Sequence, residues 1–198
     1  MSLTKCIFDL LVRIVRKYSW IGVFISMIME SACLPIPSEI VMPLTGFALC
    51  TNINSIIIAA LIASIANLIG SWIAYLVGYW GGRKLILKYG KYFLIRRKEY
   101  LKAEELFERH GAIVILIGRM LPVIRTIISL PAGIFSINPT KFTTYTLIGS
   151  IPWNLALTYL GYLLGENWHL IADYVSYLDY IVIIALIILI IYILKRNK

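Results

Sequence analysis

The sequence predicts an all-α integral membrane protein, an inverted repeat of a re-entrant hairpin plus a transmembrane helix, with an additional C-terminal transmembrane helix. Three observations support this prediction. Sixty per cent of the 198 residues are hydrophobic and 15% are charged, whereas soluble domains are about 45–50% apolar. Two apolar segments are broken by proline and glycine, and a long apolar segment that predicts a helix follows each. Basic residues gather in one polar segment between the two halves.

The chain is expected to form a single membrane domain over residues 1–198. Residues 1–18 are amphipathic and basic, which predicts a helix on the membrane surface. Residues 20–50 are apolar but interrupted by prolines, and we expect them to form the first re-entrant hairpin. Residues 53–80 predict a transmembrane helix rich in Ala, Ser and Gly, whose neighbours must approach closely.

The second half repeats this order. Residues 81–110 form a basic loop in which Glu105 precedes Arg109 by four positions, the spacing of an amphipathic surface helix. Its basic residues place this segment in the cytoplasm. The second broken segment, 111–137, predicts the second hairpin, and residues 140–165 and 174–194 predict transmembrane helices.

The broken segments can be interpreted as re-entrant hairpins or as kinked membrane spans. Trp20–Leu34 and Gly111–Leu121 reach about 22 and 16 Å as helices at roughly 1.5 Å per residue, against a hydrocarbon core of about 30 Å. Arms of this length reach the middle and return, which favours hairpins and therefore an inverted repeat. The residues expected to shape the hairpin tips are Pro35, Pro37, Pro43, Pro122, Pro131 and Gly133.

Four charged residues lie within the broken segments: Glu30, Glu39, Arg119 and Arg125. A charge at the bilayer centre costs roughly 2.5–3.5 kcal/mol on translocon scales, so all four are expected to face the protein interior or a wet cavity. Irregular backbone is tolerated only in the same place. The two arguments predict one site where the hairpin tips meet.

The residue types suggest roles for this site. The two arginines can make planar, multidentate contacts with a phosphate, and the two carboxylates can change charge by protonation and so couple the site to protons. The alternative is that the acids and arginines are structural ion-pair partners that tie the hairpins together. Both readings stay open from the sequence.

The motifs "ESACLPIPSEIVMPLTGF" at 30–47 and "GRMLPVIRTIISLPAGI" at 118–134 resemble those of the DedA family of bacterial membrane proteins, also called the SNARE-associated or VTT domain family. The resemblance covers nearly the whole chain. It implies two opposed re-entrant hairpins in a multi-pass protein of the bacterial cytoplasmic membrane. It also implies that Glu30, Glu39, Arg119 and Arg125 correspond to the family's essential acidic and arginine positions.

The function implied by the resemblance is transport of undecaprenyl phosphate from the outer to the cytoplasmic leaflet, driven by the proton motive force. Some members carry an Asp after a Pro-Gly, whereas the Pro-Ser-Glu of this chain resembles the undecaprenyl phosphate group. The alternatives are a phosphatidylethanolamine translocase or scramblase, and a proton-coupled carrier of a small solute.

Other classes of function fit the sequence less well. The net charge is +9, and the basic residues that cause it flank the apolar segments. This placement is expected for loops that meet anionic headgroups rather than for a surface that binds nucleic acid. Three cysteines and two histidines without paired spacing predict neither a disulfide framework nor a metal site, and no cofactor is expected. A membrane phosphatase would need a nucleophile and an acid that no motif supplies. The expected partners are a lipid phosphate substrate and the surrounding membrane lipids, and a homo-oligomer is compatible with the sequence.

Overall fold

A computed structural model describes residues 3–34, 36–82, 97–121 and 124–167, and every regular element in these ranges is a helix. The transmembrane helix expected at 174–194 and most of the basic loop lie outside the described residues. So do two of the prolines expected at the hairpin tips, Pro35 and Pro122.

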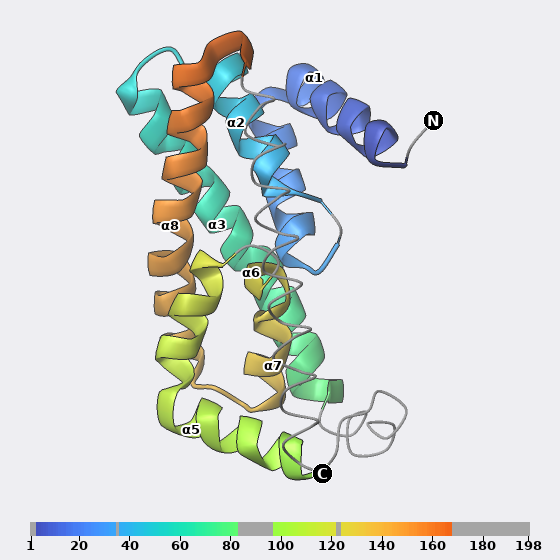
Figure 1. Ribbon diagram of the computed structural model, residues 1–198, viewed down its shortest axis with the longest axis vertical. Helices are drawn as coiled ribbons and strands as arrows, with labels where there is room; N and C mark the ends of the chain where they lie inside the picture. The colour runs from blue at the N-terminus through green and yellow to red at the C-terminus, as the bar shows by residue number, and fades with distance from the viewer. Residues whose placement is uncertain (1–2, 35, 83–96, 122–123, 168–198) are drawn as a thin grey trace, which may run out of the picture.

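The first half consists of three helices. α1 (Leu3–Ser31) bends sharply at Ser19, whose φ of 50° and ψ of −129° interrupt the helix. After this bend α1 runs to the middle of the molecule, the chain turns, and α2 (Ser38–Leu49) runs back toward the end from which α1 came (Figure 1). α3 (Ile53–Val77) then runs the full length of the molecule and ends in a π-helical turn, η1 (Gly78–Gly82).

The second half follows the same course from the opposite end. α5 (Arg97–Met120) bends at His110, and its second part runs toward the middle (Figure 1). The short helices α6 (Ile124–Ile127) and α7 (Ser129–Ile134) lead away again. α8 (Pro139–Leu164) returns along the whole molecule, antiparallel to α3, and ends in the 3₁₀ turn η3 (Gly165–Asn167).

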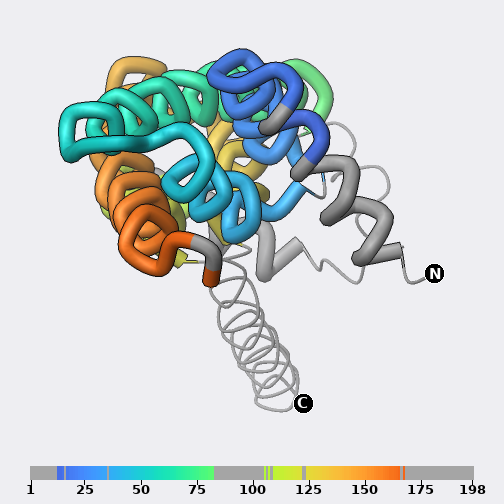
Figure 2. Tube along the Cα trace, turned by 90° about the horizontal axis from the view of Figure 1, so that it is seen from above, coloured from blue at the N-terminus to red at the C-terminus, as the bar shows by residue number. Residues whose placement is uncertain are grey.

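The two helical hairpins therefore point at each other, and their turns meet near mid-height beside α3 and α8 (Figure 1). Seen from above, the helices of both halves form one bundle (Figure 2). At the meeting point the Cys33 thiol of the first turn donates a hydrogen bond to the carbonyl of Thr126 in α6, at 3.3 Å. This bond joins the tips of two hairpins that lie 93 residues apart in sequence.

Glycines allow four close helix crossings. A Cβ at Gly70 of α3 would collide with the Ile28 carbonyl of α1, and one at Gly149 of α8 would collide with Arg119 of α5. The return arms cross in the same way, with Gly161 of α8 against Pro43 of α2 and Gly133 of α7 against Tyr75 of α3. The close approach that the small residues of 53–80 predict is confirmed at Gly70.

Three residues expected at the hairpin tips lie instead in the return arms. Pro43 is inside α2, and Pro131 and Gly133 are inside α7, whereas Pro37 does lie at the turn as the N-cap of α2. Pro131 fits because it occupies the first turn of α7, where its missing N–H costs no helical hydrogen bond. Gly133 is explained by helix contact rather than by a turn.

Two helices in the described ranges are long and apolar enough to cross a membrane, Ile53–Gly82 and Pro139–Leu164. Large apolar side chains remain exposed along both helices: Ile57, Ile58, Leu61, Ile65, Ile69 and Ile73 of α3, and Ile148, Leu155, Leu160 and Leu163 of α8. The inner faces bury small and polar residues. Apolar side chains on the outer face and polar side chains on the inner face are what a helix between lipid and protein requires.

Candidate functional site

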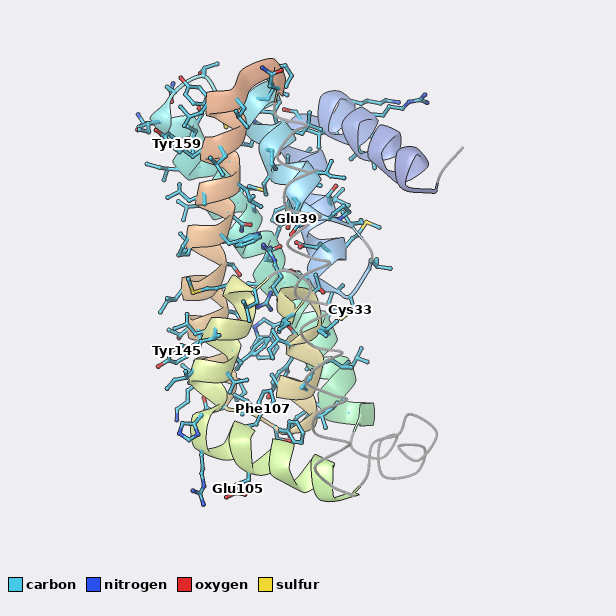
Figure 3. All side chains as sticks on the ribbon, in the orientation of Figure 1. Cys33, Glu39, Glu105, Phe107, Tyr145 and Tyr159 are labelled. Atoms are coloured by element: carbon cyan, nitrogen blue, oxygen red, sulfur yellow. The ribbon has the colours of Figure 1, made fainter. Side chains whose placement is uncertain are left out.

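The four charged residues of the broken segments all lie in the interior. Glu30 and Arg119 are 1% exposed, Arg125 is 2% exposed and Glu39 is 8% exposed. Glu30 and Arg119 come from the ends of the inbound arms α1 and α5, and Glu39 and Arg125 come from the first turns of α2 and α6. Figure 3 shows Glu39 and Cys33 in the middle part of the molecule, with Glu39 above Cys33. The hairpin turns thus bring two acids and two arginines to one depth.

Arg125 forms the ion pair of this cluster. Its NH2 group lies 3.3 Å from Oε2 of Glu30, which joins α6 to α1 across 95 residues of sequence. The guanidinium also lies over the ring of Trp153 in α8, 5.4 Å from the ring centroid, a cation–π distance. Arg125 is therefore held by both hairpins and by one long helix.

Arg119 is held by neutral groups instead. Its NH2 donates to the hydroxyl of Ser71 in α3 and to that of Ser129 in α7, the latter at 2.7 Å. No carboxylate lies within 4.0 Å of it among the described residues. Its positive charge is therefore not cancelled by direct ion pairing.

Asn67, at the centre of α3, connects the cluster to the helix backbone. With its amide turned so that both ends are satisfied, it donates to the Met27 carbonyl at 3.0 Å and to Ser31 Oγ at 3.1 Å. Its oxygen then accepts from Arg125 NH2 at 3.0 Å and from Asn154 Nδ2 at 3.2 Å. Because a carbonyl can only accept and a guanidinium can only donate, these two neighbours fix the orientation of the amide.

Several donors of the arginines remain without a hydrogen-bond partner in the part of the chain that the structure describes. They are Nε and NH1 of Arg119 and NH1 of Arg125. A buried unpaired donor costs about 1–3 kcal/mol, more when it is charged, so such groups are rare in protein interiors. Three of them on two arginines are donors of the kind that bind the oxygens of carboxylates and phosphates.

The sequence reasoning missed the neutral members of this site: Asn67, Ser71, Ser129, Trp153 and Asn154. A signal existed for two of them. Asn67 and Asn154 each lie near the centre of a long apolar helix, where a polar amide is as unexpected as a charge and points to the interior.

The fold and the site define a helical membrane protein with a charged cluster in its interior. The VTT domain matches residues 36–163, and the chain belongs to this family, the DedA family. No solved structure matches the chain.

Three relatives bear on the class of function. The chain is 38% identical to undecaprenyl phosphate transporter A of Bacillus subtilis over 67% of this chain and 67% of the relative. It is 28% identical to the protein of the same name from Staphylococcus aureus, over 82% of each. A relative from Lactococcus lactis subsp. lactis named alkaline phosphatase-like protein is 32% identical, over 83% of this chain and 79% of the relative. Two of these three relatives thus carry the name of a transporter.

The buried ion pair generates a stability prediction. Glu30→Gln should lower the free energy of unfolding by about 3 kcal/mol, because it leaves the buried cation of Arg125 without its anion. Glu105→Gln is the matched control, since the Glu105–Arg109 pair is exposed and such pairs contribute about 0.5 kcal/mol or less. Unfolding of the purified protein in detergent measures both, and equal losses in the two variants would contradict the prediction.

Proposed function

We propose that this protein binds a lipid through its phosphate and moves it from the outer to the cytoplasmic leaflet, with undecaprenyl phosphate as the substrate. The observation that carries this proposal is the pair of buried arginines with unpartnered N–H groups at mid-height. A phosphate monoester offers three oxygens without ester bonds, enough to accept from both guanidinium groups at once. The names of two relatives, undecaprenyl phosphate transporter A, agree with this substrate.

We further propose that the two hairpins are re-entrant and that the halves form an inverted repeat in the cytoplasmic membrane. Reciprocal glycine crossings support this arrangement. α1 meets α3 at Gly70 as α5 meets α8 at Gly149, and α2 meets α8 at Gly161 as α7 meets α3 at Gly133. Each hairpin thus contacts the two long helices in the same way, but from opposite ends of the molecule. Transporter sites commonly lie at such a repeat interface, near the bilayer midplane.

Proton coupling is the third part of the proposal. Glu39 has no ion pair within 4.0 Å in the described ranges, and it lies in the electrostatic field of Glu30. Arg119 and Arg125 are the charged groups that face this pair of acids from the second hairpin. A phosphate that binds Arg125 in place of Glu30 leaves the Glu30 carboxylate without a cation. Phosphate entry therefore favours uptake of a proton by the acids.

Phosphatidylethanolamine is the second candidate substrate. Its ammonium group would need a carboxylate, and Glu39 is an acid of the site that no described arginine or lysine pairs. Its phosphate is a diester, however, with only two oxygens for the unpartnered donors of both arginines. A proton-coupled carrier of a small solute would use the same cluster and differs in needing no lipid.

Transport in liposomes tests the substrate and the role of the arginines. The wild-type protein should move labelled polyprenyl phosphate across the bilayer faster than labelled phosphatidylethanolamine. Arg119→Lys and Arg125→Lys should each lower that rate at least about tenfold, because an ammonium cannot replace a planar multidentate contact. Arg109→Lys, at an exposed position, should transport normally. Full transport by both buried lysine variants would exclude the planar contact, and transport of inorganic phosphate alone would favour the solute carrier.

The pH response tests proton coupling. Transport of polyprenyl phosphate should rise as the outer side becomes more acidic, because phosphate entry favours uptake of a proton by the acids. Glu39→Gln, which resembles the protonated acid, should keep part of the transport but flatten this dependence. An unchanged pH profile in both Glu39→Gln and Glu30→Gln would leave the acids with a structural role only.

Cysteine accessibility tests the re-entrant arrangement. In a background without Cys6, Cys33 and Cys50, single cysteines at Lys98 and Lys195 should react with an impermeant maleimide only after the cells are opened. A cysteine at Asn167 should react in intact cells, because the described end of α8 lies at the opposite end of the molecule from the first part of α5. Opposite sides for Lys98 and Lys195 would refute the hairpins in favour of kinked spans.

A further inference from the structure

One face of α8 carries a second set of unpartnered polar atoms. Thr146, Ser150, Trp153 and Asn154 are spaced by three and four residues, so they share one side of the helix. Oγ1 of Thr146, Oγ of Ser150, Nε1 of Trp153 and Oδ1 of Asn154 are all buried and have no hydrogen-bond partner in the described structure. Folding alone disfavours such a concentration of unpaired polar atoms.

The same helices show that a buried hydroxyl need not remain unpaired. Ser64 in α3 and Thr158 in α8 donate to the carbonyl four residues earlier, each at 2.7 Å. This local bond is open to any serine or threonine within a helix. Ser150 does not make it, although it lies only two turns before Thr158 on α8. Its hydroxyl is therefore uncommitted at a position where a partner within the helix exists.

This face lies against the two arginines. The Trp153 ring lies under the guanidinium of Arg125. Gly149, next to Ser150, is in close contact with the Arg119 side chain, where a Cβ would lie 2.7 Å from Cβ of Arg119. Asn154 and Arg125 both donate to the oxygen of Asn67 in its satisfied orientation. Trp153 and Asn154 thus adjoin Arg125, and α8 next to Ser150 adjoins the backbone end of the Arg119 side chain.

The orientation of Asn154 is fixed by its neighbours. The Ser64 hydroxyl gives its proton to the Ala60 carbonyl, so it can only accept from Asn154 Nδ2, at 3.0 Å. Nδ2 also faces the oxygen of Asn67. The oxygen of Asn154 is therefore an unpartnered acceptor, on the helix face that also carries the unpartnered donors of Ser150 and Trp153.

We propose that Ser150, Trp153 and Asn154 of α8 form a second phosphate-binding edge, opposite the guanidinium groups of Arg119 and Arg125. The Ser150 hydroxyl and the Trp153 indole N–H donate to phosphate oxygens, and the Asn154 oxygen accepts from a P–OH group. The edge therefore recognises a singly protonated phosphate monoester, whether on a lipid or free. This inference rests on the proposed function, because it extends the site of the two arginines.

Two substitutions test the edge. Ser150→Ala and Trp153→Phe each remove one unpartnered donor and keep most of the side-chain volume. Each should weaken binding of labelled polyprenyl phosphate to the full chain in lipid nanodiscs about tenfold, the usual effect of losing one hydrogen bond to a charged group. The melting temperature of Ser150→Ala should stay the same or rise, because a buried hydroxyl without a partner stabilises nothing. Weaker binding without lower stability is the signature of a residue kept for its ligand.

Thr158→Val is the matched control, since it removes a buried hydroxyl of the same helix that is already bonded to the Asn154 carbonyl. Its binding should equal that of the wild type.

Competition with inorganic phosphate separates the two sources of the phosphate group. Displacement at millimolar concentrations indicates that the phosphate alone is recognised, and no displacement indicates that the lipid chain is needed. Wild-type binding by both Ser150→Ala and Trp153→Phe would overturn the second edge. Absence of binding by the wild-type protein would instead overturn the proposed function.

Discussion

The ion pair between Glu30 and Arg125 is the constraint on which the arrangement of the two halves depends. A carboxylate and a guanidinium that are 1% and 2% exposed must find each other, because either one left alone in the interior would cost several kcal/mol. They come from helices 95 residues apart. The two hairpins must therefore reach the same depth from opposite ends of the molecule, and their turns must touch.

Glycines at the helix crossings allow the two hairpins to reach that depth. Gly70 admits the α1 backbone at Ile28 and the side chain of Ser31, which lie before and after Glu30 in α1. Gly149 admits Arg119 itself on α5. At both points a larger residue on the long helix would push away the arm that carries a charged side chain. Close helix packing and placement of the charges are thus one property of the fold, since the contact that seats each inbound arm also sets the position of its charge.

The sequence was sufficient to predict the four buried charges, because acids and arginines inside apolar segments have few alternatives to the interior. It could not predict that Arg125 pairs with Glu30 rather than with Glu39, because both acids belong to the same hairpin and the choice depends on how deep each turn reaches. It also could not place Pro43 and Pro131 within helices, since proline breaks a helical hydrogen bond anywhere past the first turn and a turn is its more common position. The burial of Asn67 could have been predicted, because it is an isolated amide in an apolar helix. Its partners could not, because they come from three other elements.

The partners of the two arginines differ in a way that matters for an exchange of ligands. Arg119 is held by hydroxyl groups, while Arg125 shares its charge among a carboxylate, an amide and an aromatic ring. Loss of the carboxylate contact therefore leaves Arg125 supported by neutral groups, which a simple ion pair would not provide. With Glu30 and Glu39 ionised, the four charges sum to zero, and an added phosphate anion gives the cluster excess negative charge in an interior of low dielectric constant. A proton taken up by one of the acids restores neutrality, so under the proposed function the balance of two acids and two arginines links phosphate entry to proton entry.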